Sequence, residues 1–272
     1  MTSPAEAEPG AATVDEDTQP TTTALVTGAS SGIGAAIAGE LARRGHALTL
    51  VARRADRLRD MADKIGGEHG VRVEWISLDI ADASERDRLP AEIAARGQVV
   101  DLLINNAGIG TNGPFQELPV AREIELVRLN VEALVALCGA FVPRMVDRGS
   151  GGILNVASVS GFMPVPQQAT YSASKAFVLT FTEALTLDLH GTGVTATALC
   201  PGPVKTEFAG IIEGMPSAYF VDPDRVAREA IDGLEQGRRT VIPGALNKVN
   251  AVSGRHAPRG VFLPLARRFW PT

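Results

Sequence analysis

The chain has 272 residues, of which 45% are hydrophobic, with a formal net charge of −5 and only two cysteines. This composition predicts one enzyme-sized domain with a substantial core. The two cysteines and four histidines share no ligand spacing, which excludes a disulfide framework and predicts no metal site. The balanced charge argues against nucleic acid as a partner, and the lack of a long apolar run or a signal peptide predicts a cytoplasmic protein.

Residues 1–23 are rich in Pro, Ala, Thr and acids, and they contain no Lys or Arg. Such a segment has no apolar face to bury, so we expect an acidic disordered tail. The folded structure is expected to begin near Ala24.

From Ala24 onward, short apolar runs alternate with helical patterns. We expect strands at 24–28, 47–52, 71–78, 99–106, 152–158, 194–200 and 239–243. We expect helices at about 33–44, 56–65, 84–96, 120–148, 171–190 and 222–236. Strands and helices in this alternation form right-handed parallel crossovers. The pattern predicts a single α/β domain at 24–244 with a doubly wound, Rossmann-type parallel sheet, whose ligand site lies beyond the carboxyl ends of the strands.

The first predicted strand runs into the sequence TGASSGIG, which opens the first predicted helix. Glycines let the backbone approach a pyrophosphate, and a helix N-terminus presents free N–H groups to it. A tight turn without a ligand is the alternative, because short glycine motifs recur by chance. The predicted cofactor contacts in this turn are Gly28, Ser30, Ser31, Gly32, Ile33 and Gly34.

The second predicted strand ends in two arginines, Arg53 and Arg54, where an NAD-selective site would place an acid. Arg53 could hold a 2′-phosphate through a charge-assisted pair, so NADP(H) is favoured over NAD(H). Arg54 reads more simply as a solvated helix start. After the third strand, Asp79 and Ile80 are candidates for the adenine end, although Asp79 could equally serve as an ordinary cap.

Tyr171 and Lys175 are four residues apart at the start of a predicted helix, so their side chains share one face. A tyrosine is a poor base, but a neighbouring ammonium favours its phenolate. Ser158, near the end of the preceding strand, could polarise a substrate carbonyl. No Gly-x-Ser-x-Gly elbow occurs, which argues against a serine hydrolase.

These motifs, with NNAG at 105–108 and PGPVKTEF at 201–208, resemble the single-domain short-chain dehydrogenases/reductases over about residues 24–244. The resemblance implies a seven-stranded sheet, carbonyl–alcohol hydride transfer and a homo-oligomer, dimer or tetramer, built on the helices at 120–148 and 171–190. It implies a catalytic set of Asn130, Ser158, Tyr171 and Lys175, with Asn130 holding a water that relays protons to Lys175. The cofactor contacts that it implies are Asn106, Ala107, Gly108, Tyr171, Lys175, Pro201, Gly202, Val204 and Thr206. A catalytically silent NADP(H)-binding sensor or scaffold on the same fold is the alternative function.

The residues after this last motif, 209–220, are rich in apolar side chains. In the family that the chain resembles, this segment closes over the substrate. With Phe208 and Phe162 beside Ser158, a hydrophobic small-molecule ketone, aldehyde or alcohol is expected. Packing of these residues on the domain's own flank is an equally open interpretation.

Residues 245–272 form a basic extension that we expect to pack on or beside the domain. From Gln236 to the end there is no acid, and apolar residues are interleaved with the cations. Contact with an anionic membrane is one interpretation, but it is the less expected one because no helical period is clean.

Overall fold

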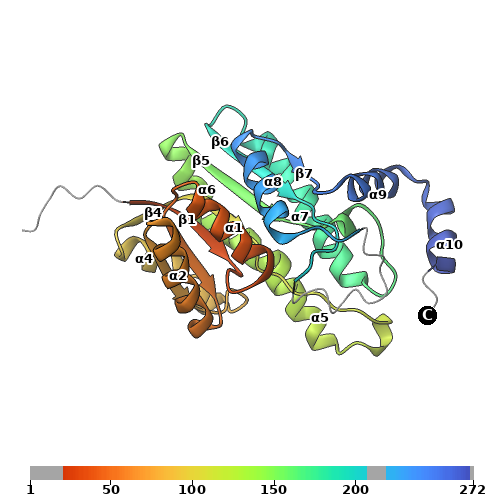
Figure 1. The fold of residues 1–272 in the computed structure, drawn as a ribbon. Helices are drawn as coiled ribbons and strands as arrows, with labels where there is room; N and C mark the ends of the chain where they lie inside the picture. Colours follow the sequence, from red (N-terminus) through yellow and green to blue (C-terminus); the bar gives the residue numbers. More distant parts are fainter. Residues whose placement is uncertain (1–20, 207–218, 270–272) are drawn as a thin grey trace, which may run out of the picture.

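The computed structural model describes residues 21–206 and 219–269. It contains a seven-stranded sheet in the order β3-β2-β1-β4-β5-β6-β7, in which every pair of neighbours is parallel (Figure 1). The strands are β1 (Thr21–Thr27), β2 (Leu48–Ala52), β3 (Val73–Ser77), β4 (Gln98–Asn105), β5 (Gly151–Val156), β6 (Val194–Leu199) and β7 (Thr240–Val241). The strand order reverses between β1 and β4, which is the place where sheets of this kind bind ligands.

Ten α-helices cover or extend this sheet in the described part of the chain. They are α1 (Gly32–Arg43), α2 (Ala55–His69), α3 (Ala83–Arg86), α4 (Leu89–Ala95), α5 (Val120–Val127), α6 (Ala133–Arg148), α7 (Ala169–Asp188), α8 (Pro223–Glu235), α9 (Ala245–His256) and α10 (Arg259–Phe269). Three short elements accompany them: the 3₁₀ turns η1 (Phe115–Glu117) and η3 (Val159–Phe162) and the π-helical turn η2 (Arg128–Glu132).

Each face of the sheet is covered by its own hydrophobic cluster. One face packs against α1, α2 and α8 through side chains such as Ile37, Leu58 and Ile231. The other packs against α4, α6 and α7 through side chains such as Leu89 and Phe141. The strands are therefore buried on both sides, which explains why they read as continuous apolar runs in the sequence.

The helical run 120–148 is apolar and long enough to cross a membrane by length and composition. In this structure it is a core element, because residues such as Leu134, Leu137 and Met145 are buried against the sheet. The sequence predicted one continuous α-helix here. The structure instead inserts the π-helical turn η2 between α5 and α6, and Asn130 lies in that turn.

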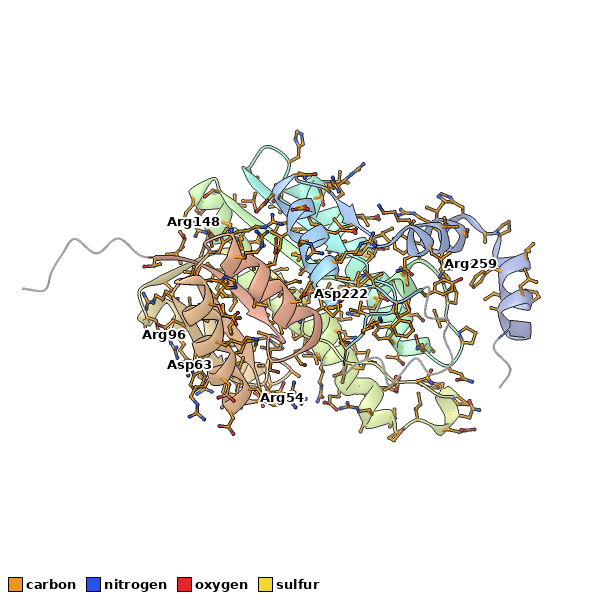
Figure 2. The ribbon with its side chains drawn as sticks, viewed as in Figure 1. Arg54, Asp63, Arg96, Arg148, Asp222 and Arg259 are labelled. Carbon is orange, nitrogen blue, oxygen red and sulfur yellow. The ribbon has the colours of Figure 1, made fainter. Side chains whose placement is uncertain are left out.

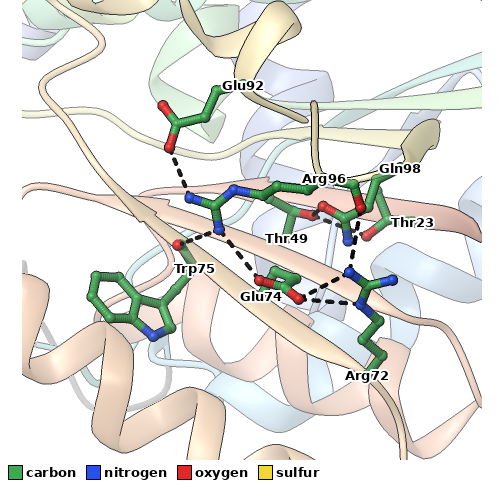
Figure 3. Close-up of polar contacts among 8 residues, drawn as sticks. All are labelled: Thr23, Thr49, Arg72, Glu74, Trp75, Glu92, Arg96 and Gln98. Carbon is green, nitrogen blue, oxygen red and sulfur yellow. Dashed lines mark hydrogen bonds and ion pairs between the residues drawn. The ribbon is translucent and has the colours of Figure 1, made fainter. Parts of the chain in front are cut away.

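The amino ends of the strands are tied together by polar side chains (Figure 3). Arg96 donates to Glu92 at 2.7 Å, to Glu74 at 3.3 Å and to the Trp75 carbonyl at 3.1 Å. Nearby, Thr49 donates to Gln98 at 3.1 Å within the sheet. These contacts join the beginnings of β2, β3 and β4 at the edge of the sheet away from their carboxyl ends.

Three predicted boundaries were wrong. β1 begins at Thr21 rather than Ala24, because Thr21–Thr23 pair with the start of β4. The helix expected at 84–96 is divided into α3 and α4. The basic extension, in which no period was clean, holds two helices, α9 and α10. Of the predicted N-terminal tail, residues 1–20 lie outside the described residues.

Candidate active site

A cavity of about 920 Å³ lies at the carboxyl ends of the strands. The segment that follows each of the strands β1 to β6 contributes residues to its lining, so the sheet itself assembles the site. Figure 2 shows Arg54 at this end of the sheet and Arg148 at the opposite end.

The glycine-rich turn after β1 forms one wall of this cavity. Gly28 and Gly32 adopt left-handed backbone angles, with φ of 63° and 60°, which favour glycine. A side chain on Gly28 would place its Cβ 2.7 Å from the Ala107 Cα, so the turn can lie against β4 only without one. Gly34, a predicted cofactor contact, does not line the cavity. A Cβ there would lie 2.5 Å from the Gly28 carbonyl oxygen, so a side chain would not fit at this position. Its role is close packing beneath the turn.

The first turn of α1 opens into the same cavity. Ser31 is its N-cap, and the Ser31 side chain accepts no hydrogen bond from the helix. The N–H groups at this end are therefore available to an anion, and Ser30, Gly32 and Ile33 line the cavity beside them. Together with the close-packed glycines, this turn fits the pyrophosphate of a dinucleotide.

Two arginines after β2 line the same cavity. Arg54 is the exposed N-cap residue of α2, as the simpler interpretation expected, and it also donates to the Ser30 hydroxyl at 3.0 Å and to the Ser31 hydroxyl at 2.9 Å, which holds it at the turn. The Arg53 guanidinium lies 3.7 Å from the Asp79 carboxylate, and both side chains line the cavity. Both arginines are thus placed where the sequence predicted only Arg53.

Asp79 and Ile80 line the cavity after β3, as expected. The Asp79 carboxylate accepts from the Ala81 N–H at 3.0 Å, which is the ordinary capping role that the sequence left open. The buried Arg86 side chain donates to the Ile80 carbonyl at 3.2 Å and to Glu132 at 3.0 Å. Arg86 therefore supports this loop from behind.

The NNAG segment after β4 holds the glycine-rich turn in place. The Asn106 side-chain amide donates to the Thr27 carbonyl at 2.9 Å and to the Gly28 carbonyl at 3.2 Å. Ala107 and Gly108 line the cavity next to it, as do the predicted contacts after β6, which are Pro201, Gly202, Val204 and Thr206.

Ser158, Tyr171 and Lys175 meet in the middle of the cavity. Tyr171 and Lys175 lie in the first two turns of α7, and a hydrogen bond joins the Tyr171 and Ser158 side chains. The Lys175 Nζ donates to the Val156 carbonyl at 2.8 Å and lies 5.8 Å from the centre of the Tyr171 ring. The structure thus brings these three predicted residues together.

Burial controls the protonation of this group. It raises the pKa of Tyr171 to about 12, and the hydrogen bond with Ser158 opposes that rise. It lowers the pKa of Lys175 to about 8. At neutral pH the phenol is therefore protonated, and the amine keeps a charge that mild alkali removes.

Asn130 lies behind Lys175 and does not line the cavity itself. Its amide donates to the Ile109 carbonyl at 2.9 Å and to the Ser174 hydroxyl at 3.1 Å, and its oxygen accepts from the Ile109 N–H. A Cβ on Gly108 would lie 3.1 Å from the Asn130 oxygen and 3.4 Å from the Lys175 Nζ. Asn130 thus anchors the loop after β4 beside Lys175, and its role in a water relay stays a prediction.

The substrate end differs from what the sequence predicted. Phe162 is buried in the core and does not line the cavity, because η3 turns its side chain into the cluster beneath α7. Phe208 lies outside the described residues. Met163, Val165 and Pro166, from the stretch 161–166 that follows Ser158, line the cavity, and sequence reasoning missed Ile109, Asn112, Leu129, Gln167, Gln168 and Asn250, which line it too. Asn250 carried no signal in the sequence.

Known proteins match the chain over most of its length. A family model described as short chain dehydrogenase matches residues 22–215. An uncharacterised oxidoreductase of Myxococcus xanthus is 40% identical over 215 residues, which make up 79% of this chain and 84% of that protein.

Solved structures match the fold as well. A short-chain dehydrogenase from Sphingobium yanoikuyae in complex with NADPH is 35% identical with a TM-score of 0.77, covering 89% of this chain and 95% of that one. The bulky-bulky ketone specific alcohol dehydrogenase from Comamonas testosteroni is 32% identical with a TM-score of 0.74, covering 93% and 94%. On the family match and these likenesses, this chain belongs to the short-chain dehydrogenase/reductase family of oxidoreductases.

Proposed function

We propose that this protein is an NADP(H)-dependent oxidoreductase that interconverts a hydrophobic ketone or aldehyde and its alcohol, with Tyr171 as the general acid and base. The observation that carries the proposal is the meeting of Tyr171 with Ser158 and Lys175 inside a cavity that also contains a dinucleotide cradle. A nicotinamide bound there would supply or accept the hydride. Every other task falls to side chains of this chain.

Tyr171 is the proton donor in the direction of carbonyl reduction. Its pKa of about 12 keeps it protonated at neutral pH, so it can give a proton to the carbonyl oxygen as negative charge develops there. Ser158 is hydrogen-bonded to it, and the same hydroxyl can donate to that oxygen and orient the carbonyl.

Lys175 stabilises the phenolate that remains after Tyr171 has given up its proton. Its ammonium is buried near the Tyr171 ring, where charge interactions are screened less than in water. Its bond to the Val156 carbonyl fixes its position against the end of β5. Deprotonation of Lys175 would remove this stabilisation, which makes the lysine's charge a requirement for turnover.

The preference for NADP(H) is supported by Arg53 and Arg54, which both line the cavity. Arg54 is already held by two serine hydroxyls of that turn, and Arg53 is paired only weakly with an exposed carboxylate. Two guanidinium groups favour a 2′-phosphate, which accepts charge-assisted hydrogen bonds from them.

A hydrophobic substrate is supported by the apolar part of the cavity wall, Ile109, Leu129, Met163, Val165 and Pro166. The related enzyme from Comamonas testosteroni is described as specific for bulky-bulky ketones. The side-chain amides of Asn112, Gln167, Gln168 and Asn250 share this wall, so the substrate also has room for an uncharged polar group.

A homo-oligomer, dimer or tetramer, is part of the proposal. Val120, Ile124 and Val127 follow one another at helical spacing on α5 and are 66%, 48% and 44% exposed. Phe177 on α7 is 40% exposed and stacks on Phe181. Apolar stripes of this kind on exposed helices fit a subunit contact. A cytoplasmic location stays a prediction.

The test is oxidation of NADPH and NADH by the purified protein across ketones and aldehydes of increasing apolar size. We expect NADPH to be preferred, bulky apolar ketones to turn over best, and Tyr171→Phe to lower kcat by about 10²–10⁴-fold, because general acid catalysis contributes that much. Cofactor binding without turnover of any carbonyl, in wild type as in Tyr171→Phe, would favour the silent sensor instead.

A further inference from the structure

Helix α9 has two unlike sides. Its residues Asn247, Ala251 and Gly254 are buried against the domain. At 100° per residue, Leu246, Val249 and Val252 fall on the opposite side of the helix, where they are 41%, 63% and 57% exposed. α9 therefore presents an apolar stripe outward.

Helix α10 continues this exposed surface. It lies beyond α9, away from the sheet, with Arg259 near its start (Figure 2). Val261 and Leu265 share one side of it and are 57% and 49% exposed, and Leu263, on its other side, is 50% exposed. We call the exposed side chains of 245–265 the C-terminal surface. Exposed aliphatic side chains collected on two adjacent helices are unusual for a solvated surface and mark an interaction site.

The sequence of the C-terminal segment carries charge of one sign only. Residues 245–272 contain five Lys and Arg and no Asp or Glu, in a chain whose net charge is −5. On α9, Lys248 lies between the apolar stripe and the buried face, and at the start of α10 Arg259 lies over the Phe262 ring. Arg255 is paired with Glu183 of the domain, which ties α9 to α7.

The C-terminal surface is also joined to the active site. Asn250 of α9 lines the cavity. A Cβ on Gly254 would lie 2.3 Å from the Met163 side chain, so α9 packs tightly against another residue of the cavity wall. One side of α9 thus helps to form the cavity, and its other side carries the exposed apolar stripe.

We propose that the C-terminal surface binds anionic lipid, with the apolar stripe of α9 and the Val261 and Leu265 side of α10 entering the interface and Lys248 and Arg259 meeting the headgroups. Charge complementarity supports lipid, because basic residues near an anionic leaflet each add about 1 kcal/mol of attraction and the segment has no acid to oppose it. Sequence periodicity alone made this the less expected interpretation, and the exposed stripe on α9 is the new observation.

The experiment is co-sedimentation of the full chain with vesicles of phosphatidylcholine containing about a third phosphatidylserine, and with phosphatidylcholine alone. Wild type is expected to bind the anionic vesicles, to release them as salt rises, and to bind the neutral vesicles much less. Val249→Asp/Val252→Asp and Lys248→Glu/Arg259→Glu are each expected to weaken binding at least tenfold.

The control is Leu187→Asp, which places one of these two charges at an apolar residue that is 69% exposed at the end of α7. It is expected to bind vesicles like wild type. Reduction of a water-soluble ketone by every variant shows that the active site is folded, which separates this proposal from the proposed function. Wild type that ignores anionic vesicles, or variants that bind as wild type does, would overturn the proposal. So would a fall in molar mass by light scattering for Val249→Asp/Val252→Asp, since the occupant would then be a second copy of the chain.

Discussion

The two ends of this sheet are built in opposite ways. At the amino ends of the strands, Arg96 is matched by the carboxylates of Glu74 and Glu92. At the carboxyl ends, Lys175 is buried but donates to a backbone carbonyl instead of a carboxylate, and Gln167 adopts a left-handed backbone conformation with φ of 63°. An ion pair such as that of Arg96 stabilises the fold. A buried charge without a carboxylate partner, or a strained backbone, is more typical of a site that acts on a ligand. The comparison therefore separates residues that hold the sheet together from residues that work on a ligand.

The largest expected effect is the pH dependence of reduction. Because burial lowers the pKa of Lys175 to about 8, its ammonium is present below that pH and is lost above it. We expect kcat/KM for ketone reduction to be level below pH 8 and to fall about tenfold per pH unit above it, since that parameter reports groups of the free enzyme.

Lys175→Arg is the control for this profile. A guanidinium does not titrate below pH 12, so the variant should keep a level profile to pH 10, at whatever reduced rate its shape permits. An unchanged fall near pH 8 in Lys175→Arg would assign the titration to another group. Thermal melts at each pH check that both proteins remain folded.

The next effect concerns cofactor preference. Arg54→Ala should lower kcat/KM with NADPH by roughly 10–100-fold, because one charge-assisted hydrogen bond contributes about 1.5–3 kcal/mol. The value with NADH should change little, because NADH has no 2′-phosphate for the arginine to meet. Arg53→Ala is the companion variant, and a loss confined to one of the two would show which guanidinium carries the preference. Equal losses with both cofactors would contradict this role.

A change at the opposite end of the sheet should leave turnover alone. Arg96→Ala removes hydrogen bonds to Glu74, Glu92 and the Trp75 carbonyl from a side chain that is only partly exposed. We expect the free energy of unfolding to fall by about 1–2 kcal/mol and Tm by a few degrees, because these bonds are part-buried and partly screened. Denaturant melts and ketone reduction on the same preparation measure both quantities. A loss of kcat with an unchanged Tm would show that Arg96 serves turnover and not stability, which would contradict the contrast between the two ends of the sheet.

Most of the fold could be predicted from the sequence because the apolar runs that mark the strands, and the motifs that follow them, are local features of the chain. Strands buried on two faces read as apolar runs, and the positions where those runs end are enough to place Gly28, Asn106 and Ser158 in the same region. The number of strands, their parallel type and their places along the chain were predicted correctly, with boundary errors of a few residues. The residues of the site that belong to motifs could be predicted, since these motifs follow parallel strands whose carboxyl ends lie together.

The features that could not be predicted from the sequence depend on contacts between residues far apart in the chain or on the direction of a turn. Arg54 is the exposed start of α2 that the sequence predicted, but nothing local in the sequence shows that its guanidinium also contacts the glycine-rich turn. Phe162 looked like a substrate contact because its distance from Ser158 in sequence is short, but the turn η3 points it into the core. The π-helical turn around Asn130 has the same apolar residues as the helices on either side of it. α9 was missed because its buried face carries Asn247 and Gly254, which do not form an apolar pattern.

The smallest effect is the one at Gln167, the residue other than glycine that has a positive φ among the described residues. A left-handed conformation costs a residue with a side chain roughly 1 kcal/mol, and glycine avoids that strain while losing more chain entropy on folding. Gln167→Gly should therefore raise the free energy of unfolding by less than about 1 kcal/mol and lower kcat/KM for ketones that carry a second polar group, because the Gln167 amide lines the cavity. Gln168→Gly is the matched control, since Gln168 lines the same wall with φ of −133° and should be destabilised. If both glycine variants lose stability alike, no strain is stored at Gln167, and the contrast between the two ends of the sheet then rests on Lys175 alone.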